Sequence, residues 1–207
     1  MDTNKMDMQS IVNFILEIEK LKGVTRKTRP LGLGRYENSA EHSWQLALLA
    51  RALEQYAEVA LDINRVIRML LVHDIGEIDT GDTMVYAEGG WEERKVAELA
   101  AAKRIFGMLP GETGEEFLEL WQEFEKAETR EACFANAMDR AMPVLINLAN
   151  DGQSWKENGI SHERVTRRIG PPIRAGCPAL WNYIEARLKE AEAKGLFGAA
   201  ESAGGSR

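Results

Sequence analysis

The stretch of residues 70–82 begins as an apolar helical segment and ends as a cluster of acidic side chains. The apolar residues at its start have the i, i+3, i+4 spacing of a buried helix face: Ile67, Leu70 and Leu71. His73 continues this face, and Asp74 lies beside it. The pattern therefore predicts a buried helix that ends in an imidazole and a carboxylate.

Several carboxylates follow this helix. Gly76 is expected to end it, because glycine tolerates the left-handed conformation found at helix ends. The acids that follow in the predicted turn or loop are Glu77, Asp79 and Asp82. Either a cation neutralises this negative charge, or the segment is strained. Asp79 is interpreted as structural, and an Asx-type turn is the alternative role for Asp82.

Helical periodicity recurs along the chain, without strand-like alternation or an internal repeat. Helices are predicted over residues 8–21, 38–53, 63–75, 91–109, 115–128, 129–149, 162–169 and 178–194. Asn38 has the position of an N-cap, and Glu41 that of its capping-box partner. The pattern predicts an all-α helical bundle.

The boundaries of this bundle follow from the breaks in the periodicity. Residues 155–159 are expected to form a loop, and Pro171-Pro172 is expected to close the preceding helix. Small and polar residues dominate the end of the chain. We therefore predict a single domain over residues 1–197 and a disordered tail over residues 198–207.

Composition and charge narrow the functional class. The chain has 207 residues, a hydrophobic fraction of 44% and a net charge of -7, which argues against general binding to nucleic acid or membrane surfaces. No signal peptide and no apolar run long enough to span a bilayer is evident. Cys133 and Cys177 lack C-x-x-C spacing; one disulfide is possible, but two reduced thiols are favoured. We expect a soluble cytoplasmic protein.

Two basic segments stand out against this acidic composition. Residues 22–35 are rich in lysine and arginine, and form either a solvated loop or an anion-binding loop. Arg94 and Lys95 begin a predicted helix, where pairing with Glu98 at helical spacing is slightly favoured over binding a phosphate. His162 begins another helix, and a surface or capping role is expected for it.

A group of imidazoles and carboxylates carries the strongest chemical signal. His42, His73, Asp74 and Asp139 each lie on or beside an apolar helix face, where such groups are costly unless paired. Each alone has a simpler explanation, such as a satisfied core histidine or, for Asp139, an ion pair with Arg140 or Arg130. Together they suit one divalent metal ion of the kind that activates water and polarises phosphoryl oxygens. Manganese, cobalt, iron, nickel and zinc all fit this donor set.

The order of these residues resembles the H…HD…D signature of the HD-domain phosphohydrolase superfamily, an all-helical metal-dependent fold. The segments 38–43 (NSAEHS) and 73–82 (HDIGEIDTGD) are similar to the branch that contains the bacterial 5′-deoxynucleotidases and the HD domain-containing protein 2 group. The resemblance extends from about residue 8 to residue 190.

This resemblance implies roles for individual residues. It implies that His42, His73, Asp74 and Asp139 bind the metal, and that Glu77 orients or activates water or protonates the leaving group. Asp82 would contact the sugar, and Arg26 would hold the substrate. Lys27, the next candidate substrate contact, stands where bacterial members have tryptophan, which puts sugar and base selectivity in question. A homodimer is also implied.

Three functions are compatible with this pattern. The first is a 5′-nucleotidase that hydrolyses (deoxy)ribonucleoside 5′-monophosphates to nucleoside and phosphate. The second keeps the same core but acts on a cyclic or polyphosphorylated nucleotide. The third is a non-catalytic helical module with a structural metal. The first is favoured, because Glu77 and the Gly81-Asp82 segment match the nucleotidase branch, and a structural site needs no additional acid.

Overall fold

The structure is a computed structural model that describes residues 3–198. Most of the predicted tail, residues 199–207, therefore lies outside the described residues. Gly198, the first residue of that predicted tail, is tied to the body of the protein: its N–H donates a 3.0 Å hydrogen bond to the carbonyl oxygen of Ile160.

The described part of the chain is helical, which confirms the predicted all-α class. Within residues 3–198 there is no strand, only an isolated antiparallel bridge between Thr25 and Asn38. In chain order the helices are α1 (Thr3–Ile18), η1 (Glu19–Gly23), α2 (Ser39–Leu53), η2 (Glu54–Tyr56), α3 (Ile63–Val72), α4 (Glu77–Thr80), α5 (Trp91–Phe106), α6 (Thr113–Lys126), α7 (Arg130–Ala149), α8 (Gln153–Glu157), α9 (His162–Gly176) and α10 (Pro178–Ala193). None of them has the length and apolarity needed to cross a membrane.

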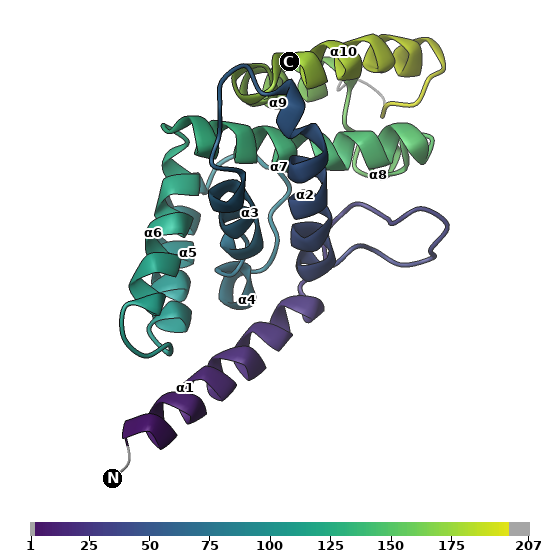
Figure 1. Cartoon of the computed structure of the whole chain (residues 1–207). Coiled ribbons are helices and arrows are strands. Elements are labelled where there is room, and N and C mark those ends of the chain that lie inside the picture. The colour runs from purple at the N-terminus through teal and green to yellow at the C-terminus, as the bar shows by residue number, and fades with distance from the viewer. Residues whose placement is uncertain (1–2, 199–207) are drawn as a thin grey trace.

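Helix α7 lies at the centre of the fold (Figure 1). It packs against α2, α3 and α6 and also against α9 and α10. Its inward side chains are buried: Phe134, Ala137, Met138 and Ala141. Complete burial of a side chain such as Phe134 contributes roughly 1.5–3 kcal/mol. Asp139 therefore lies on a helix that apolar packing holds in place.

The predicted helix starts are confirmed where side-chain caps specify them. Asn38 accepts a hydrogen bond from the backbone N–H of Glu41, whose side chain accepts one from the N–H of Asn38, which completes the capping box of α2. Asp62, Thr129 and Ser161 accept equivalent backbone bonds at the starts of α3, α7 and α9. These caps fix where the chain enters the helices that carry His42 and Asp139.

Helix α3 differs from its prediction at its end and in its buried face. It ends at Val72, and Gly76 has a right-handed conformation, so this glycine is not a left-handed stop. The reason for a glycine is space, because a Cβ at Gly76 would lie 3.0 Å from the carbonyl oxygen of Glu98 on α5. The buried face includes Val66, Met69 and Leu70, whereas the predicted core residue Leu71 is 48% exposed.

Two predictions near the C-terminal end of the chain were wrong. Residues 153–157 form helix α8 instead of a loop, because Trp155 is buried and stacks on Phe197 at a centroid distance of 4.6 Å. Helix α9 continues through Pro171-Pro172 to Gly176. Its buried face packs on α7 and α10, and this packing outweighs the backbone hydrogen bonds that the prolines remove. Cys133 and Cys177 are free thiols, as favoured.

Helix α1 and the segment 24–38 extend from the body of the molecule (Figure 1). The apolar residues Ile11, Val12 and Ile15 of α1 are exposed, whereas Phe14 is buried in the core. Val96 on α5 is also exposed, at 70%. Periodicity identified both helices but could not show that part of each apolar face remains uncovered.

Candidate metal centre and active-site cavity

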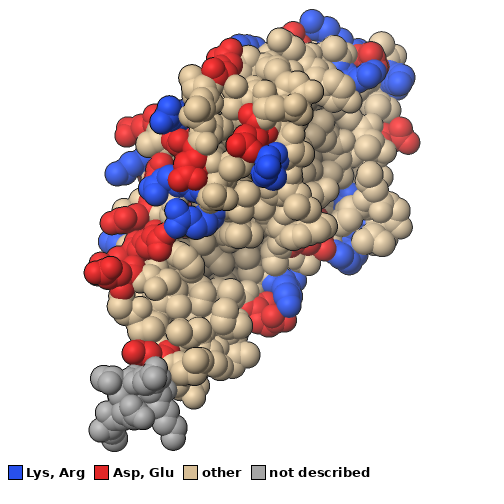
Figure 2. Space-filling view, viewed as in Figure 1, with Lys and Arg blue, Asp and Glu red and all other residues tan. Residues whose placement is uncertain are grey.

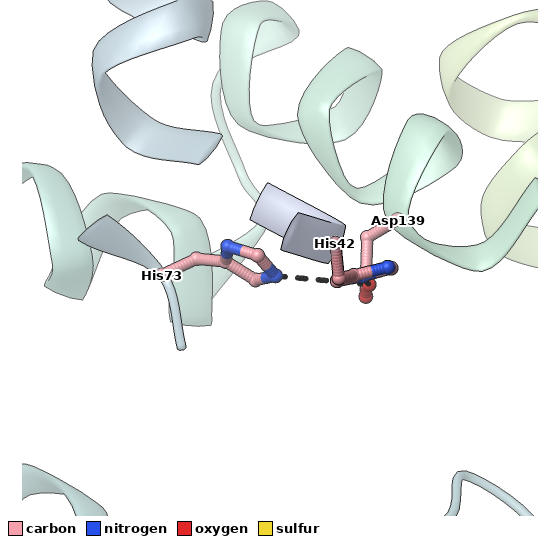
Figure 3. Close-up of side chains that lie close together, drawn as sticks. All are labelled: His42, His73 and Asp139. Atoms are coloured by element: carbon pink, nitrogen blue, oxygen red, sulfur yellow. Dashed lines mark hydrogen bonds and ion pairs between the residues drawn. The ribbon is translucent and has the colours of Figure 1, made fainter. Parts of the chain in front are cut away.

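His42, His73 and Asp139 converge from three helices (Figure 3). His42 lies in the first turn of α2, His73 follows the last residue of α3, and Asp139 lies within α7. The Nε2 atoms of His42 and His73 are 3.1 and 3.7 Å from Asp139 Oδ1. All three residues are buried, and one candidate ligand atom from each lies within 4.8 Å of the others.

The surrounding contacts orient both imidazoles for metal binding. His73 Nδ1 donates a 2.9 Å hydrogen bond to the carbonyl oxygen of Leu70, so its Nε2 is the nitrogen available to a metal ion. That buried Nε2 has no hydrogen-bond partner in the described part of the chain. On the other imidazole, His42 Nδ1 faces Glu37 Oε2 at 3.5 Å. Carbonyl and carboxylate partners behind histidine ligands are typical of metal sites, so these residues fit a divalent ion.

Asp74, the fourth predicted ligand, lies beside this group without belonging to its compact core. Its Oδ1 is 3.0 Å from His73 Nε2, and its Oδ2 accepts a 2.9 Å hydrogen bond from Arg26 Nη1. The structure thus brings His42, His73 and Asp139 together. One oxygen of Asp74 also faces His73 Nε2.

The charges of this group are strongly coupled. Although burial lowers the pKa of His73, the carboxylates of Asp74 and Asp139 raise it to about 9. Burial acts to raise the pKa of Asp139, but Arg140 and the two imidazoles hold it well below its usual range. A metal ion that binds here takes the position of the proton on His73, since a histidine ligand must be neutral.

A cavity of about 540 Å³ opens beside these residues. Glu77 and Asp82 line it, as do His73, Asp74 and Asp139. Ser39 Oγ donates a 2.6 Å hydrogen bond to Glu77 Oε2. Burial and the nearby charge of Asp74 raise the pKa of Glu77 to about 9, although Arg26 opposes this shift. Burial likewise raises the pKa of Asp82. Glu77 can therefore carry a proton at neutral pH.

Arg26 is a partly buried member of the site, whereas a solvated loop is the default expectation for the basic segment that carries it. Its Nη1 lies 2.9 Å from Asp74 Oδ2 and 3.4 Å from Asp82 Oδ1. These carboxylates raise the pKa of Arg26, so it stays charged. Lys27 is exposed and borders a smaller neighbouring pocket of about 70 Å³, so it does not line the main cavity.

Glu37 and Ser39 are site residues that sequence reasoning missed. Glu37 is 2% exposed, and its Oε2 lies 3.5 Å from both His42 Nδ1 and Arg26 Nε. A carboxylate next to the N-cap of α2, at the end of a basic loop, was the available signal. Ser39 follows that N-cap directly and supports Glu77.

The other residues that the sequence singles out do not belong to the His42–His73–Asp139 group. Arg94 and Lys95 line the main cavity. Their positive charges act to lower the pKa of Glu98, but neither side chain forms the expected helical ion pair with it. Asp79 accepts hydrogen bonds from two nitrogens of Arg104, consistent with a structural role. His162 Nδ1 lies 3.0 Å from Glu192 Oε1 at the start of α9.

Comparisons with known proteins agree with this architecture. A family model for the HD domain matches residues 18–181. The chain is similar to a crystal structure of a predicted metal-dependent phosphohydrolase from Magnetospirillum magnetotacticum, with 40% identity and a TM-score of 0.87. That match covers 94% of this chain and 100% of the other.

Curated relatives are more distant. The 5′-deoxynucleotidase HDDC2 of Dictyostelium discoideum is 31% identical over 114 residues, which cover 53% of this chain and 60% of the relative. The 5′-deoxynucleotidase HDDC2 of Homo sapiens is 29% identical over 138 residues, which cover 66% of each chain. The chain thus matches about three fifths to two thirds of the length of these relatives. Because the family model covers most of the sequence, and the fold and the His-His-Asp cluster agree with it, the chain belongs to the HD domain family.

Proposed function

We propose that this protein is a metal-dependent phosphohydrolase that converts (deoxy)ribonucleoside 5′-monophosphates to nucleoside and phosphate. The observation that carries the proposal is the buried His42–His73–Asp139 cluster at the wall of a cavity that also holds Glu77. Relatives named 5′-deoxynucleotidase and a structural neighbour described as a predicted metal-dependent phosphohydrolase support it.

The proposed metal ligands are His42, His73, Asp74 and Asp139. Their two nitrogens and carboxylate oxygens suit manganese, cobalt, iron, nickel or zinc. A divalent ion held there would lower the pKa of a coordinated water and polarise a phosphoryl oxygen. Asp74 would join the other ligands through its Oδ1, which already faces His73 Nε2, while its Oδ2 stays paired with Arg26.

Other side chains have proposed roles in moving protons and holding the substrate. Hydrolysis forms a bond from a water oxygen to phosphorus and breaks the bond from phosphorus to the 5′ oxygen, which must gain a proton. Glu77, whose pKa is raised to about 9 in the metal-free site, is the proposed donor of that proton. Asp82 would contact the sugar, and Arg26 would hold Asp74 and Asp82 in place.

The test is phosphate release from a panel of ribo- and deoxyribonucleoside 5′-monophosphates. Metal-stripped protein would be assayed with each divalent metal added back. We expect metal-dependent turnover that His73→Ala abolishes and that Glu77→Gln lowers by roughly 10²–10⁴-fold. Glu54→Gln is the matched control, because Glu54 pairs with Arg51 in an exposed i, i+3 ion pair.

The same assay can reject the proposal. Metal-loaded protein that releases phosphate from no monophosphate, but hydrolyses a cyclic or polyphosphorylated nucleotide, would reassign the substrate. A Glu77→Gln variant with full turnover would remove Glu77 from the reaction. Metal binding with no hydrolysis of any of these nucleotides would leave a binding module as the function.

We also propose that the protein is a cytoplasmic homodimer. Two free thiols fit a reducing compartment. Helix α1 exposes a row of apolar side chains that a monomer rarely leaves uncovered: Ile11, Val12, Ile15 and Leu16. In the face shown in Figure 2, charged side chains gather more densely along the α6 edge than over the middle of the molecule.

The mass of the protein in solution tests this assembly. Light scattering of the wild type is expected to give the mass of two chains, and the double variant Ile15→Glu, Leu16→Glu that of one. Val96→Glu is the control, because Val96 is an exposed apolar residue on α5. A wild type with the mass of a single chain would reject the dimer.

A further inference from the structure

The main cavity is lined by cationic as well as acidic side chains. Arg94, Lys95, Arg140 and Arg168 all line it. Arg140 already has a carboxylate nearby, since its Nη1 lies 3.6 Å from Asp139 Oδ2, and Arg168 donates its Nε–H to the carbonyl oxygen of Val85. Arg94 differs, because its buried Nη1 has no hydrogen-bond partner among the described residues.

Helix α5 places Arg94 beside the proposed reaction centre. The backbone of Glu98 packs directly on Gly76, which is two residues from Asp74. Arg94 precedes Glu98 by four residues, so it lies on the same face of α5, about one turn toward its start. Its long side chain can therefore extend along the cavity wall near the turn that carries Asp74.

The conformation of Arg94 is supported from one side by Trp91. The guanidinium carbon of Arg94 lies 5.4 Å from the centre of the Trp91 ring, and that of Arg168 lies 5.2 Å from it. The ring is itself fixed, because Trp91 Nε1 donates a 3.1 Å hydrogen bond to the carbonyl oxygen of Ala87. Stacking of this kind orients a guanidinium without using its N–H donors.

A buried charged donor without a partner calls for an acceptor. The cavity already contains the carboxylates that pair with Arg26, but Arg94 has none within ion-pair distance in residues 3–198. A phosphate monoester carries nearly two negative charges at neutral pH and offers several acceptor oxygens in a geometry that fits a guanidinium. The free guanidinium N–H of Arg94 is therefore suited to such a ligand.

We propose that Arg94, held against Trp91, binds the phosphate group of the substrate and retains inorganic phosphate after hydrolysis. This inference rests on the proposed phosphohydrolase function and assigns a phosphate-binding residue within the same cavity. Arg26 then serves mainly to hold the acidic residues, and Arg94 supplies the free positive charge that the phosphate requires.

The experiment measures binding of inorganic phosphate and hydrolysis in parallel. Manganese-loaded protein would be titrated with phosphate by calorimetry, and KM and kcat would be measured for a deoxyribonucleoside 5′-monophosphate. In Arg94→Gln we expect phosphate binding to weaken by about 10- to 100-fold, KM to rise by a similar factor, and Arg94→Lys to recover part of the loss. Arg167→Gln is the control, since Arg167 is an exposed neighbour of Arg168 on α9.

The two readouts separate this proposal from the one on which it rests. A wild type that binds phosphate but hydrolyses no monophosphate would overturn the proposed substrate, and the phosphate titration of the Arg94 variants would still decide the role of Arg94. Unchanged phosphate binding in Arg94→Gln would overturn the role of Arg94, even in an active enzyme. A wild type that binds no phosphate would also overturn it.

Discussion

Glu37 connects the metal-binding group to the loop that precedes α2. Its Oε2 lies 3.5 Å from His42 Nδ1 on one side and 3.5 Å from Arg26 Nε on the other. A carboxylate behind a histidine ligand fixes the ring orientation and makes the ligating nitrogen more basic. Glu37 therefore contributes to the metal site without being one of its ligands.

Replacement of Glu37 by glutamine is expected to weaken metal binding by about 10- to 100-fold, because the amide keeps the shape but loses the charge behind His42. Competition with a chromophoric chelator would measure the affinity, and circular dichroism would verify folding. Glu54→Gln, at an exposed ion pair, is expected to leave the affinity unchanged. Equal affinities for the Glu37 variant and the wild type would show that Glu37 does not tune the site.

Glu98 is an acid whose surroundings favour its neutral form. Burial, together with the charges of Glu125 and Asp74, raises its pKa from 4.5 to about 7, although Arg94 and Lys95 oppose the shift. Between these two values the folded protein holds a proton that the unfolded chain has lost. Its contribution to stability is therefore complete below about pH 4.5 and is lost as the pH rises toward 7.

Replacement of Glu98 by glutamine is expected to stabilise metal-free protein at pH 8 by at most about 3 kcal/mol, and to change little at pH 4.5. The physical reason is that glutamine removes the cost of ionising a partly buried carboxyl. Urea unfolding of both proteins across this range would measure the difference. The same dependence of stability on pH in variant and wild type would contradict the shift.

At the scale of elements, the contact between α4 and α5 sets the spacing of the cavity walls. Gly76 lies against the backbone of Glu98, so the turn with Asp74 and Glu77 is as close to α5 as the backbones allow. The same contact fixes how far α5, which carries Arg94, lies from Asp74 and Glu77. A larger side chain at this point would move one wall relative to the other.

We expect Gly76→Ala to lower the free energy of unfolding by roughly 1–3 kcal/mol, because its Cβ would lie 3.0 Å from the Glu98 carbonyl oxygen. Phosphate release should fall as well, since both walls move. Urea unfolding and the nucleotidase assay would measure the two effects. Gly23→Ala is the control, because nothing lies within 4 Å of its added Cβ. Equal effects of the two substitutions would argue against a tight contact.

Local sequence predicted the elements well where caps or strong apolar faces specify them. The Asn38–Glu41 capping box predicts the start of α2 correctly, and the helix predicted over residues 178–194 matches α10. Helix α8 and the continuation of α9 through Pro171-Pro172 depend on partners that are distant in sequence, such as Phe197 and the face of α7. No local pattern carries that information.

In the site too, some residues are evident from local sequence and others only from the folded structure. His42, His73 and Asp139 were predictable, because a polar residue on an apolar helix face costs folding free energy unless it is paired or binds a metal. Glu37 and Arg94 belong to segments rich in charge, where solvation is the default interpretation. The burial of Glu37 and of the Arg94 Nη1 atom is a property of the folded chain.

For the whole molecule, the proposed metal ion would join helices that the core already holds together. His42, His73 and Asp139 come from α2, the end of α3 and α7, and these helices pack against one another. An ion that binds only the folded protein adds stability according to its concentration relative to its dissociation constant. It is expected to reinforce this fold without creating it.

Metal-stripped protein is therefore expected to remain helical and to gain about 2.7 kcal/mol in the presence of metal at 100 times its dissociation constant. For a chain of this size the melting temperature should rise by roughly 5–10 °C. Thermal unfolding followed by circular dichroism would measure this gain, and His73→Ala should show almost none. A metal-stripped protein without helical signal would contradict the expectation.

The separation of the ligands along the chain also has a consequence for the time at which the ion can bind. His42 and Asp139 are 97 positions apart. At ordinary rates of synthesis, about 5–20 s pass between the appearance of the first histidine and that of the aspartate. During this interval the two imidazoles are present without the α7 carboxylate, and a pair of imidazoles alone favours copper or nickel over manganese. Correct loading is therefore expected to follow completion of α7, so the metals available to the finished protein determine which ion it carries.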